Sequence, residues 1–143
     1  MADAALYTLR VELRLRTLHY LDRAIREGSY RLTEDVAEPD PFVIDLNADL
    51  TACDEGAAAT LTPRDRRFVL CGLAELMDAV LVRCVRDLGP INAMGTNKML
   101  RNVLALQQNL RNLGESPIEV DFRSRRYWSL AGSGDVKVRL TGE

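Results

Sequence analysis

The sequence predicts an all-α fold, an up-and-down antiparallel bundle of about five helices. Apolar residues recur at steps of three and four through most of the 143 residues, which is the spacing of a helix face that packs against other helices. Proline and glycine stand mainly where these periodic runs begin and end. The connections between the runs are short, which favours antiparallel neighbours.

The first two helices have recognisable boundaries. The first is expected over about residues 3–27 and ends at Gly28, because glycine readily adopts the left-handed conformation that follows a helix. It carries two neighbouring apolar stripes, which predicts a helix sandwiched between others. These stripes are Leu6, Leu9, Leu13 and Tyr20, and then Val11, Leu15, Leu18, Leu21 and Ile25. After a polar, acidic connection, Asp40 as N-cap and Pro41 open the second helix, which is expected to stop near Gly56.

Three further helices complete the predicted bundle. Thr62 and the following proline open the third, which is expected to continue unbroken to residue 88, before a Gly-Pro pair. The fourth runs to about residue 113. Ser116 and Glu119 form a capping box that opens the fifth, which is expected to stop by Gly132. The predicted organisation is one helical domain, residues 1–131, and a poorly ordered tail, residues 132–143, where a short apolar alternation has no second strand to pair with.

Composition and charge exclude several classes of protein. A hydrophobic share of 47% and a charged share of 28% are those of a soluble globular domain, and no run approaches the length of a membrane span. The N-terminal residues lack the apolar core of a signal peptide, so an intracellular location is expected. The net charge of −2 argues against nucleic-acid binding. Residues 31–60 hold one arginine and eight acidic residues, and this segment is expected to orient helices or a partner electrostatically.

No group of residues predicts catalysis, a cofactor or a metal. Three widely spaced cysteines and one histidine, His19, do not supply a zinc site, and no nucleophile can be assigned to that imidazole. The alternation from Asp45 to Thr51 resembles the start of a calcium loop, but Leu50 and Gly56 stand where glycine and glutamate are required. The Gly132–Gly134 segment lacks the preceding strand of a phosphate loop. The protein is therefore not expected to be an enzyme.

Two polar features of the last two helices remain. The fourth helix is rich in asparagine and glutamine, which indicates hydrogen bonds to adjacent backbone or to another subunit. The fifth carries a basic and aromatic cluster that forms the candidate partner surface. Its residues are Arg123, Arg125, Arg126, Tyr127 and Trp128. Salt bridges within the bundle, a protein partner and an anionic lipid surface are the alternatives for this cluster.

Four stretches resemble the C-terminal region of a known family. They are HYLDRAIREGSYRLTEDVAEPDPFVIDLNADLTACDE (residues 19–55), RFVLCGLAELMDAVLV (67–82), INAMGTNKMLRNVLALQQNL (91–110) and DFRSRRYWSL (121–130). In this order and spacing, the LNADL and ALQQNL strings are similar to those of the exocyst complex component 4 family, the eighth Sec-class subunits of the exocyst. The resemblance covers roughly residues 6–130.

The resemblance implies a non-catalytic scaffold subunit that tethers secretory vesicles to the plasma membrane before SNARE-mediated fusion. The fold it implies is the terminal bundle of a helical-rod tethering subunit. Implied partners are other exocyst subunits, with small GTPases or SNARE regulators as further candidates. It also implies a cytoplasmic location at sites of secretion, with peripheral membrane association through the complex. Family subunits are far longer and carry an N-terminal coiled-coil region, so a C-terminal piece or a truncated gene product is expected here. The Gly89–Pro90 link and the residues after Leu130 depart from the family pattern.

Overall fold

The computed structural model describes residues 2–84, 87–88, 91–114 and 122–133, with side chains described for residues 4–129 of these. Six α-helices lie in this part of the chain and no strand does, which confirms the predicted all-α class. The helices are α1 (Ala2–Arg26), α2 (Pro41–Ala58), α3 (Pro63–Leu70), α4 (Leu73–Arg83), α5 (Ala93–Asn112) and α6 (Arg123–Ser133).

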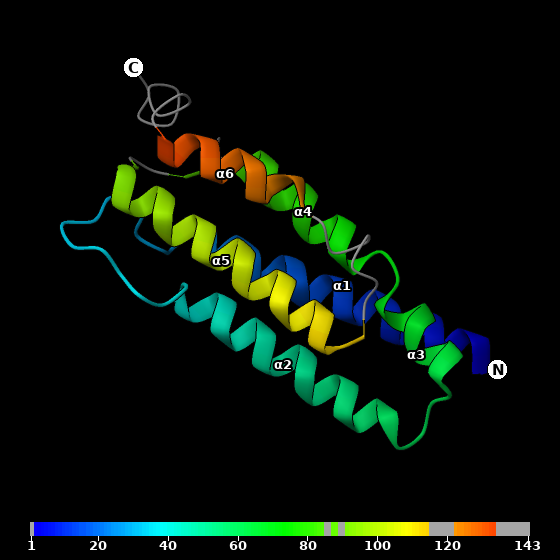
Figure 1. The fold of residues 1–143 in the computed structure, drawn as a ribbon. Coiled ribbons are helices and arrows are strands. Elements are labelled where there is room, and N and C mark those ends of the chain that lie inside the picture. The colour runs from blue at the N-terminus through cyan, green and yellow to red at the C-terminus, as the bar shows by residue number, and fades with distance from the viewer. Residues whose placement is uncertain (1, 85–86, 89–90, 115–121, 134–143) are drawn as a thin grey trace.

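The helices form a closed ring in cross-section. Contacts link α1 to α2, α2 to α5, α5 to α6, α6 to α4 and α4 back to α1, while the short α3 packs on both α1 and α2. Figure 1 shows the long helices running in alternating directions along a common axis, which is the predicted up-and-down arrangement. The core fills the centre of this ring, and its largest fully buried side chains include Met77, Met99, Leu106, Phe122 and Trp128.

Two of the predicted N-caps are present with the expected geometry. The Asp40 carboxylate accepts the backbone N–H of Phe42 at 2.9 Å at the start of α2. The Thr62 hydroxyl accepts the backbone N–H of Asp65 at 3.2 Å at the start of α3. In both helices proline follows the cap, where its missing N–H removes a donor that the first helical turn leaves without a partner.

The prediction of one unbroken third helix is wrong, because the chain breaks at Cys71 and Gly72. Cys71 has ψ 130° and ends α3, and Gly72 has φ 82°, a left-handed conformation that side chains disfavour. Arg14 of α1 lies 3.5 Å from the Gly72 carbonyl oxygen and donates to it, so α1 lies against the break. The apolar periodicity continues through the break, which is why the sequence pattern alone conceals it.

The polar face of α5 binds the backbone of the 27–40 connection. The Asn102 amide oxygen accepts the Asp40 N–H at 2.7 Å, and its nitrogen donates to the Tyr30 hydroxyl at 2.9 Å. Asn92 caps α5 and exchanges two hydrogen bonds with the backbone of Leu32. A side chain at Gly95 would overlap the Tyr30 carbonyl, so the connection crosses α5 directly at that glycine. Of the two predicted roles for the asparagine-rich helix, bonding to adjacent backbone is therefore confirmed.

The acidic segment is partly neutralised within the bundle. Four of its eight carboxylates pair with cations on three other helices, at N–O distances between 2.7 and 3.5 Å. The pairs are Asp35–Arg101, Asp40–Lys98, Asp49–Arg16 and Asp54–Arg66. Lys98 and Asp40 are the most buried of these partners, with side chains 11% and 2% exposed. The segment therefore orients α2 and its connection against α1, α3 and α5, as its charge predicted.

Two helices continue past their predicted ends, and other predicted boundaries lie outside the described residues. Helix α2 continues through Gly56 to Ala58. Helix α6 is described from Arg123 and continues to Ser133, two residues past the predicted domain boundary. The Ser116–Glu119 capping box, the Gly89–Pro90 pair, and the tail beyond Ser133 lie outside the described part of the chain.

Candidate interaction site

The candidate partner surface on α6 divides into exposed cations and a buried anchor. Arg123, Arg125 and Arg126 are exposed. Trp128 is fully buried, its indole Nε1–H donates to the Leu81 carbonyl of α4 at 2.9 Å, and it therefore belongs to the core. The half-buried ring of Tyr127 packs edge-on against the indole, with centroids 5.3 Å apart. Only the arginines of the predicted cluster can thus present full side chains to a partner.

Asp78 of α4 fixes the start of α6 and was not identified from the sequence. Its two carboxylate oxygens accept the backbone N–H groups of Arg123 at 3.1 Å and of Ser124 at 2.8 Å. The Arg123 guanidinium also lies 3.5 Å from this carboxylate, although that side chain is 81% exposed. The sequence does contain a signal for this role. Asp78 lies between Met77 and Leu81 on the buried face of α4, where a carboxylate requires a polar partner.

A second surface, on α1, consists of apolar side chains that the described structure leaves partly exposed. Tyr7, Val11, Leu15 and Leu18 are 62%, 39%, 57% and 40% exposed, and we call these four residues the α1 stripe. The prediction that α1 is sandwiched on both apolar faces is therefore only partly correct. Of the second predicted stripe, Leu21 and Ile25 are buried in the core, whereas Val11, Leu15 and Leu18 are exposed. The stripe around Leu13 packs against the bundle, whereas the α1 stripe faces outward.

The α1 stripe leads into a groove between α1 and α4. The groove has a volume of about 490 Å³, and Leu18 belongs to both surfaces. Its remaining lining is formed by Asp22, Ile25, Leu76, Ala79, Val80, Arg83, Cys84 and Asp87. The apolar floor suits side chains of a docked helix, while the charges lie at the rim.

The charges of the groove are partly paired. Arg26 bonds the Asp22 carboxylate at 2.6 Å and lies 3.5 Å from Asp87, so one cation bridges two carboxylates. The hydrogen bond to Asp22, followed by the attraction of both carboxylates, raises the pKa of Arg26. Arg83 is exposed, and the ion pairs of the described residues do not include it. The edge of the groove therefore carries a cluster of net negative charge, formed by Asp22, Arg26 and Asp87, and a separate cation, Arg83.

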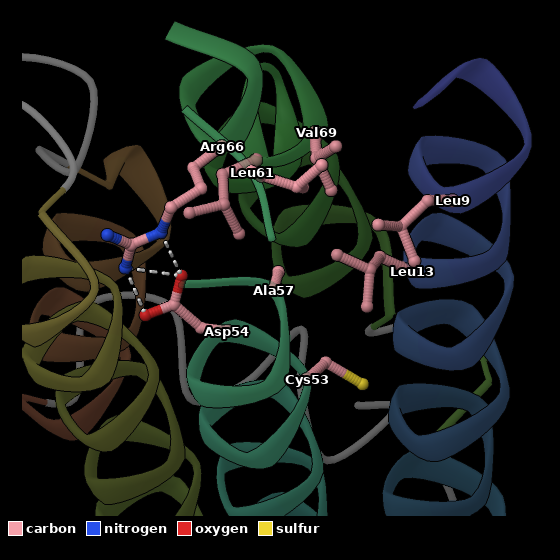
Figure 2. Close-up of a pocket in the computed structure, with 9 residues that line it drawn as sticks. Leu9, Leu13, Cys53, Asp54, Ala57, Leu61, Arg66 and Val69 are labelled. Atoms are coloured by element: carbon pink, nitrogen blue, oxygen red, sulfur yellow. Dashed lines mark hydrogen bonds and ion pairs between the residues drawn. The ribbon is translucent and has the colours of Figure 1, made fainter. Parts of the chain in front are cut away.

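A smaller hollow lies where α1, α2 and α3 meet. Figure 2 shows Leu9 and Leu13 of α1 facing Val69 of α3, with Cys53 below them. The Arg66 guanidinium closes one side through hydrogen bonds of 2.7 and 2.8 Å to the two oxygens of Asp54 (Figure 2). The hollow has a volume of about 10 Å³, which is at most the space of one water molecule. It is a packing seam and too small for a ligand.

The other candidate chemistries find no support among the described residues. His19 is exposed on α1 and contacts the ring of Tyr20. The Asp45–Thr51 stretch is a regular part of α2 and not a loop, and its Asp49 pairs with the Arg16 guanidinium. No group of three or more potential ligands that could hold a metal is found in the described ranges. No helix described here is long and apolar enough to cross a membrane.

The cysteines do not form a reactive centre. Burial raises the pKa of the Cys84 thiol to about 12, and its Sγ–H donates to the Leu81 carbonyl at 3.2 Å. Burial is also the main cause that raises the pKa of Cys53. Both thiols are therefore protonated at neutral pH and poor nucleophiles. Cys71 is exposed at the break between α3 and α4, and all three cysteines are free.

Comparison with known proteins identifies the family. The chain is 33% identical to human exocyst complex component 4 over 143 residues, or 98% of this chain. It is 39% identical to the probable exocyst component sec8 of Neurospora crassa over 118 residues, 80% of the chain, and 34% identical to the Drosophila melanogaster component over 91%. The chain belongs to the exocyst complex component 4 family. No family model matches it.

The match covers a small part of each exocyst component 4 relative. The chain spans 15% of the human protein, 14% of the Drosophila protein and 11% of the Neurospora protein. The resemblance expected from the LNADL and ALQQNL strings is thereby confirmed. The α1 stripe and the α1–α4 groove are consequently features of a bundle that, in these relatives, is one part of a much longer polypeptide.

Proposed function

We propose that this chain is a non-catalytic scaffold module of the exocyst, which tethers secretory vesicles to the plasma membrane before SNARE-mediated fusion. The similarity to exocyst component 4 along 98% of the chain carries this proposal. The structure agrees with it physically, because the polar side chains of α5 and α2 are used to hold the bundle together. The similarity favours a scaffold role over the docking of anionic lipid.

The partners in this proposal are other exocyst subunits. Small GTPases and SNARE regulators are included as further candidate partners, and the location is cytoplasmic, at plasma-membrane sites of secretion. The exposed guanidinium groups of Arg123 and Arg125 provide one candidate contact for such a partner. Their positive charge dominates the surface of α6, because this helix contains no acidic residue. They would attract an acidic surface of a neighbouring subunit, with membrane association through the complex rather than through this chain.

Affinity purification from native cells tests the scaffold role. The native polypeptide that contains this chain is tagged and purified, and the bound proteins are identified by mass spectrometry. We expect the other exocyst subunits to be enriched over a tag-only control. Failure to enrich any exocyst subunit under conditions that recover the intact complex through a different tagged subunit would rule out the proposal.

Charge reversal tests the arginine surface within the same experiment. Arg123→Glu combined with Arg125→Glu is expected to reduce recovery of at least one subunit several-fold and to make the remaining binding less dependent on salt. Arg64→Glu combined with Arg67→Glu reverses two exposed cations on α3, changes the net charge by the same amount, and serves as the matched control. Equal loss with both variants would show that net charge, not the α6 surface, determines recovery.

A further inference from the structure

Arg10 and Arg14 are the two arginines of α1 that form no ion pair within the described part of the chain. The other three arginines of this helix each bond a carboxylate, at N–O distances between 2.6 and 3.0 Å. Glu12 lies between Arg10 and Arg14 in the sequence but bonds Arg16 instead. Both unpaired side chains are half-buried, so water screens their charges less than it does on an open surface.

The two guanidinium groups converge on Gly72, at the break between α3 and α4. A methyl group at this glycine would lie 3.2 Å from Arg14 Nη1 and 3.4 Å from Arg10 Nη2. The Arg10 guanidinium carbon also lies 5.2 Å from the centroid of the Phe68 ring, and Arg14 donates to the Gly72 carbonyl at 3.5 Å. Both arginines lie on the side of α1 that contacts α3 and α4 (Figure 1). A single small group beside Gly72 can therefore contact both guanidinium groups.

The charge of the pair indicates which group fits beside Gly72. Two guanidinium groups held close together repel each other, and a bound anion between them removes that repulsion. A phosphate monoester carries about two negative charges at neutral pH and presents three acceptor oxygens. A carboxylate carries one charge and two oxygens, so it balances only one of the two cations. Because arginine also binds phosphate through two parallel hydrogen bonds, a phosphate monoester matches this pair.

The position of the pair favours a phosphate that is carried by a protein side chain. Arg10 and Arg14 are half-buried where α1 meets α3 and α4, so a phosphate must extend inward to reach them. A side chain of a partner protein can extend in this way, whereas a bilayer surface contacts the groups that protrude from a helix. Clusters of arginine are a recurring means by which proteins bind phosphorylated side chains.

We propose that Arg10, Arg14 and Gly72 form a binding site for a phosphorylated serine or threonine side chain of a partner protein. The inference rests on the proposed function in one respect, because the scaffold role supplies protein partners. Both arginines donate to the phosphate oxygens, and the missing side chain of Gly72 leaves room for them. Phosphorylation of the partner switches this contact on, because the unmodified hydroxyl group carries no charge.

Titration of the 143-residue chain with a small phosphoserine compound tests the site. The probe is N-acetyl-O-phosphoserine N-methylamide in a buffer without phosphate or sulfate, and N-acetylglutamate N-methylamide is the carboxylate comparison. We expect saturable changes in the ¹⁵N NMR signals of the Gly72 amide and of the Arg10 and Arg14 Nε–H groups. The glutamate compound should bind at least ~10-fold more weakly, because its charge and its number of acceptor oxygens are smaller.

A pair of substitutions assigns the binding to the two guanidinium groups. Arg10→Gln with Arg14→Gln is expected to weaken phosphoserine binding at least ~10-fold, because two charge-assisted donors are lost. Arg83→Gln with Arg111→Gln is the matched control, since it removes two exposed cations of α4 and α5 and changes the net charge equally. The control should bind the probe as the wild type does. Circular dichroism verifies that each variant is folded, and the two titrations of the wild type require no variant.

Vesicle flotation distinguishes a protein from a membrane as the carrier of the phosphate. Vesicles of phosphatidylcholine and phosphatidylinositol 4-phosphate present the same phosphate monoester on a bilayer. We expect the chain not to float with them. Flotation that is lost in the Arg10 and Arg14 double variant would assign the site to a membrane and overturn the proposal.

Three further results would overturn the inference. They are the absence of a saturable change at Gly72, equal binding of the glutamate compound, and equal weakening in both double variants. These measurements need no other subunit, so their outcome is independent of the affinity purification. No phosphoserine binding together with recovery of the exocyst subunits would reject this site and retain the scaffold function. Binding of the probe without recovery of any subunit would retain the phosphate site and reject the scaffold function.

Discussion

Asp78 on α4 caps the first turn of α6 by accepting the Ser124 backbone N–H at 2.8 Å. The same carboxylate accepts the Arg123 N–H at 3.1 Å, so two donors that the helix itself cannot satisfy are paired across 45 residues of sequence. The Trp128 indole bonds the Leu81 carbonyl one turn further along both helices. The interface of α4 and α6 is therefore held at two points by polar side chains in an apolar setting.

Loss of the Asp78 carboxylate should loosen α6. Asp78→Ala is expected to lower the free energy of unfolding by about 1–2 kcal/mol, because the buried Ser124 N–H and the partly buried Arg123 N–H lose their acceptor. Asp78→Asn, which keeps one acceptor oxygen, should cost less. The single tryptophan, Trp128, lies on α6, so its fluorescence during urea unfolding measures the effect directly. Equal stability of the alanine variant and the wild type would show that water replaces the cap.

The glycines of α5 and α2 should respond in opposite directions to alanine. Gly95→Ala is expected to cost at least ~3 kcal/mol, because the added methyl group would overlap the Tyr30 carbonyl. Gly56→Ala is the matched control, since no atom lies within 4 Å of the position of its added Cβ. It should raise stability by up to about 1 kcal/mol through helix propensity. Circular dichroism during thermal unfolding compares the two, and similar destabilisation by both would refute the close approach.

The buried ion pair should be far more sensitive than an exposed one. Lys98→Met is expected to cost about 3–5 kcal/mol, because it leaves the Asp40 carboxylate buried without its cation. Arg26→Met removes an exposed pair with Asp22 and should leave the melting temperature unchanged. Denaturant midpoints of the two variants give the comparison. A small effect at Lys98 would indicate that the hydrogen bond from the Phe42 N–H is sufficient for the Asp40 carboxylate.

The buried thiol should make the fold sensitive to alkaline pH. The pKa of Cys84 is raised from an ordinary value of 9.0 to about 12, so the folded state holds this proton where the unfolded state releases it. The free energy of unfolding should therefore fall as pH rises from 9 to 12. Burial also raises the pKa of Tyr30, which adds to the same trend. Cys84→Ala should flatten the profile measured by Trp128 fluorescence, whereas an unchanged slope would assign it to other groups.

Much of the fold could be predicted because its causes are local. The caps at Asp40 and Thr62 depend on side chains that reach only two or three residues along the chain, and the structure reproduces them. The break at Gly72 was missed because the apolar spacing of Val69, Leu73 and Met77 continues through it. A left-handed glycine at that point is selected by packing against α1, which local spacing does not encode.

The candidate site was only partly predictable for the same reason. A basic and aromatic cluster on α6 is visible in the sequence, but burial of Trp128 against α4 separates its anchor from its exposed arginines. Both apolar stripes of α1 are visible too, but the pattern does not distinguish the exposed Leu15 from Leu21 of the same stripe, which is buried. Exposure depends on how many neighbours the bundle supplies, and that number is not a property of a single helix.

The sequence by itself determined the helical class, the caps, the alternating topology and the family, because these follow from local spacing and from similarity along the chain. The tertiary structure alone decided which groups meet across long separations, such as Asp78 with Ser124 and Asn102 with Tyr30. It also decided that the stripe through Leu15 faces outward. The physical reason is that periodicity determines which side of a helix is apolar, whereas burial depends on which other helices lie against that side.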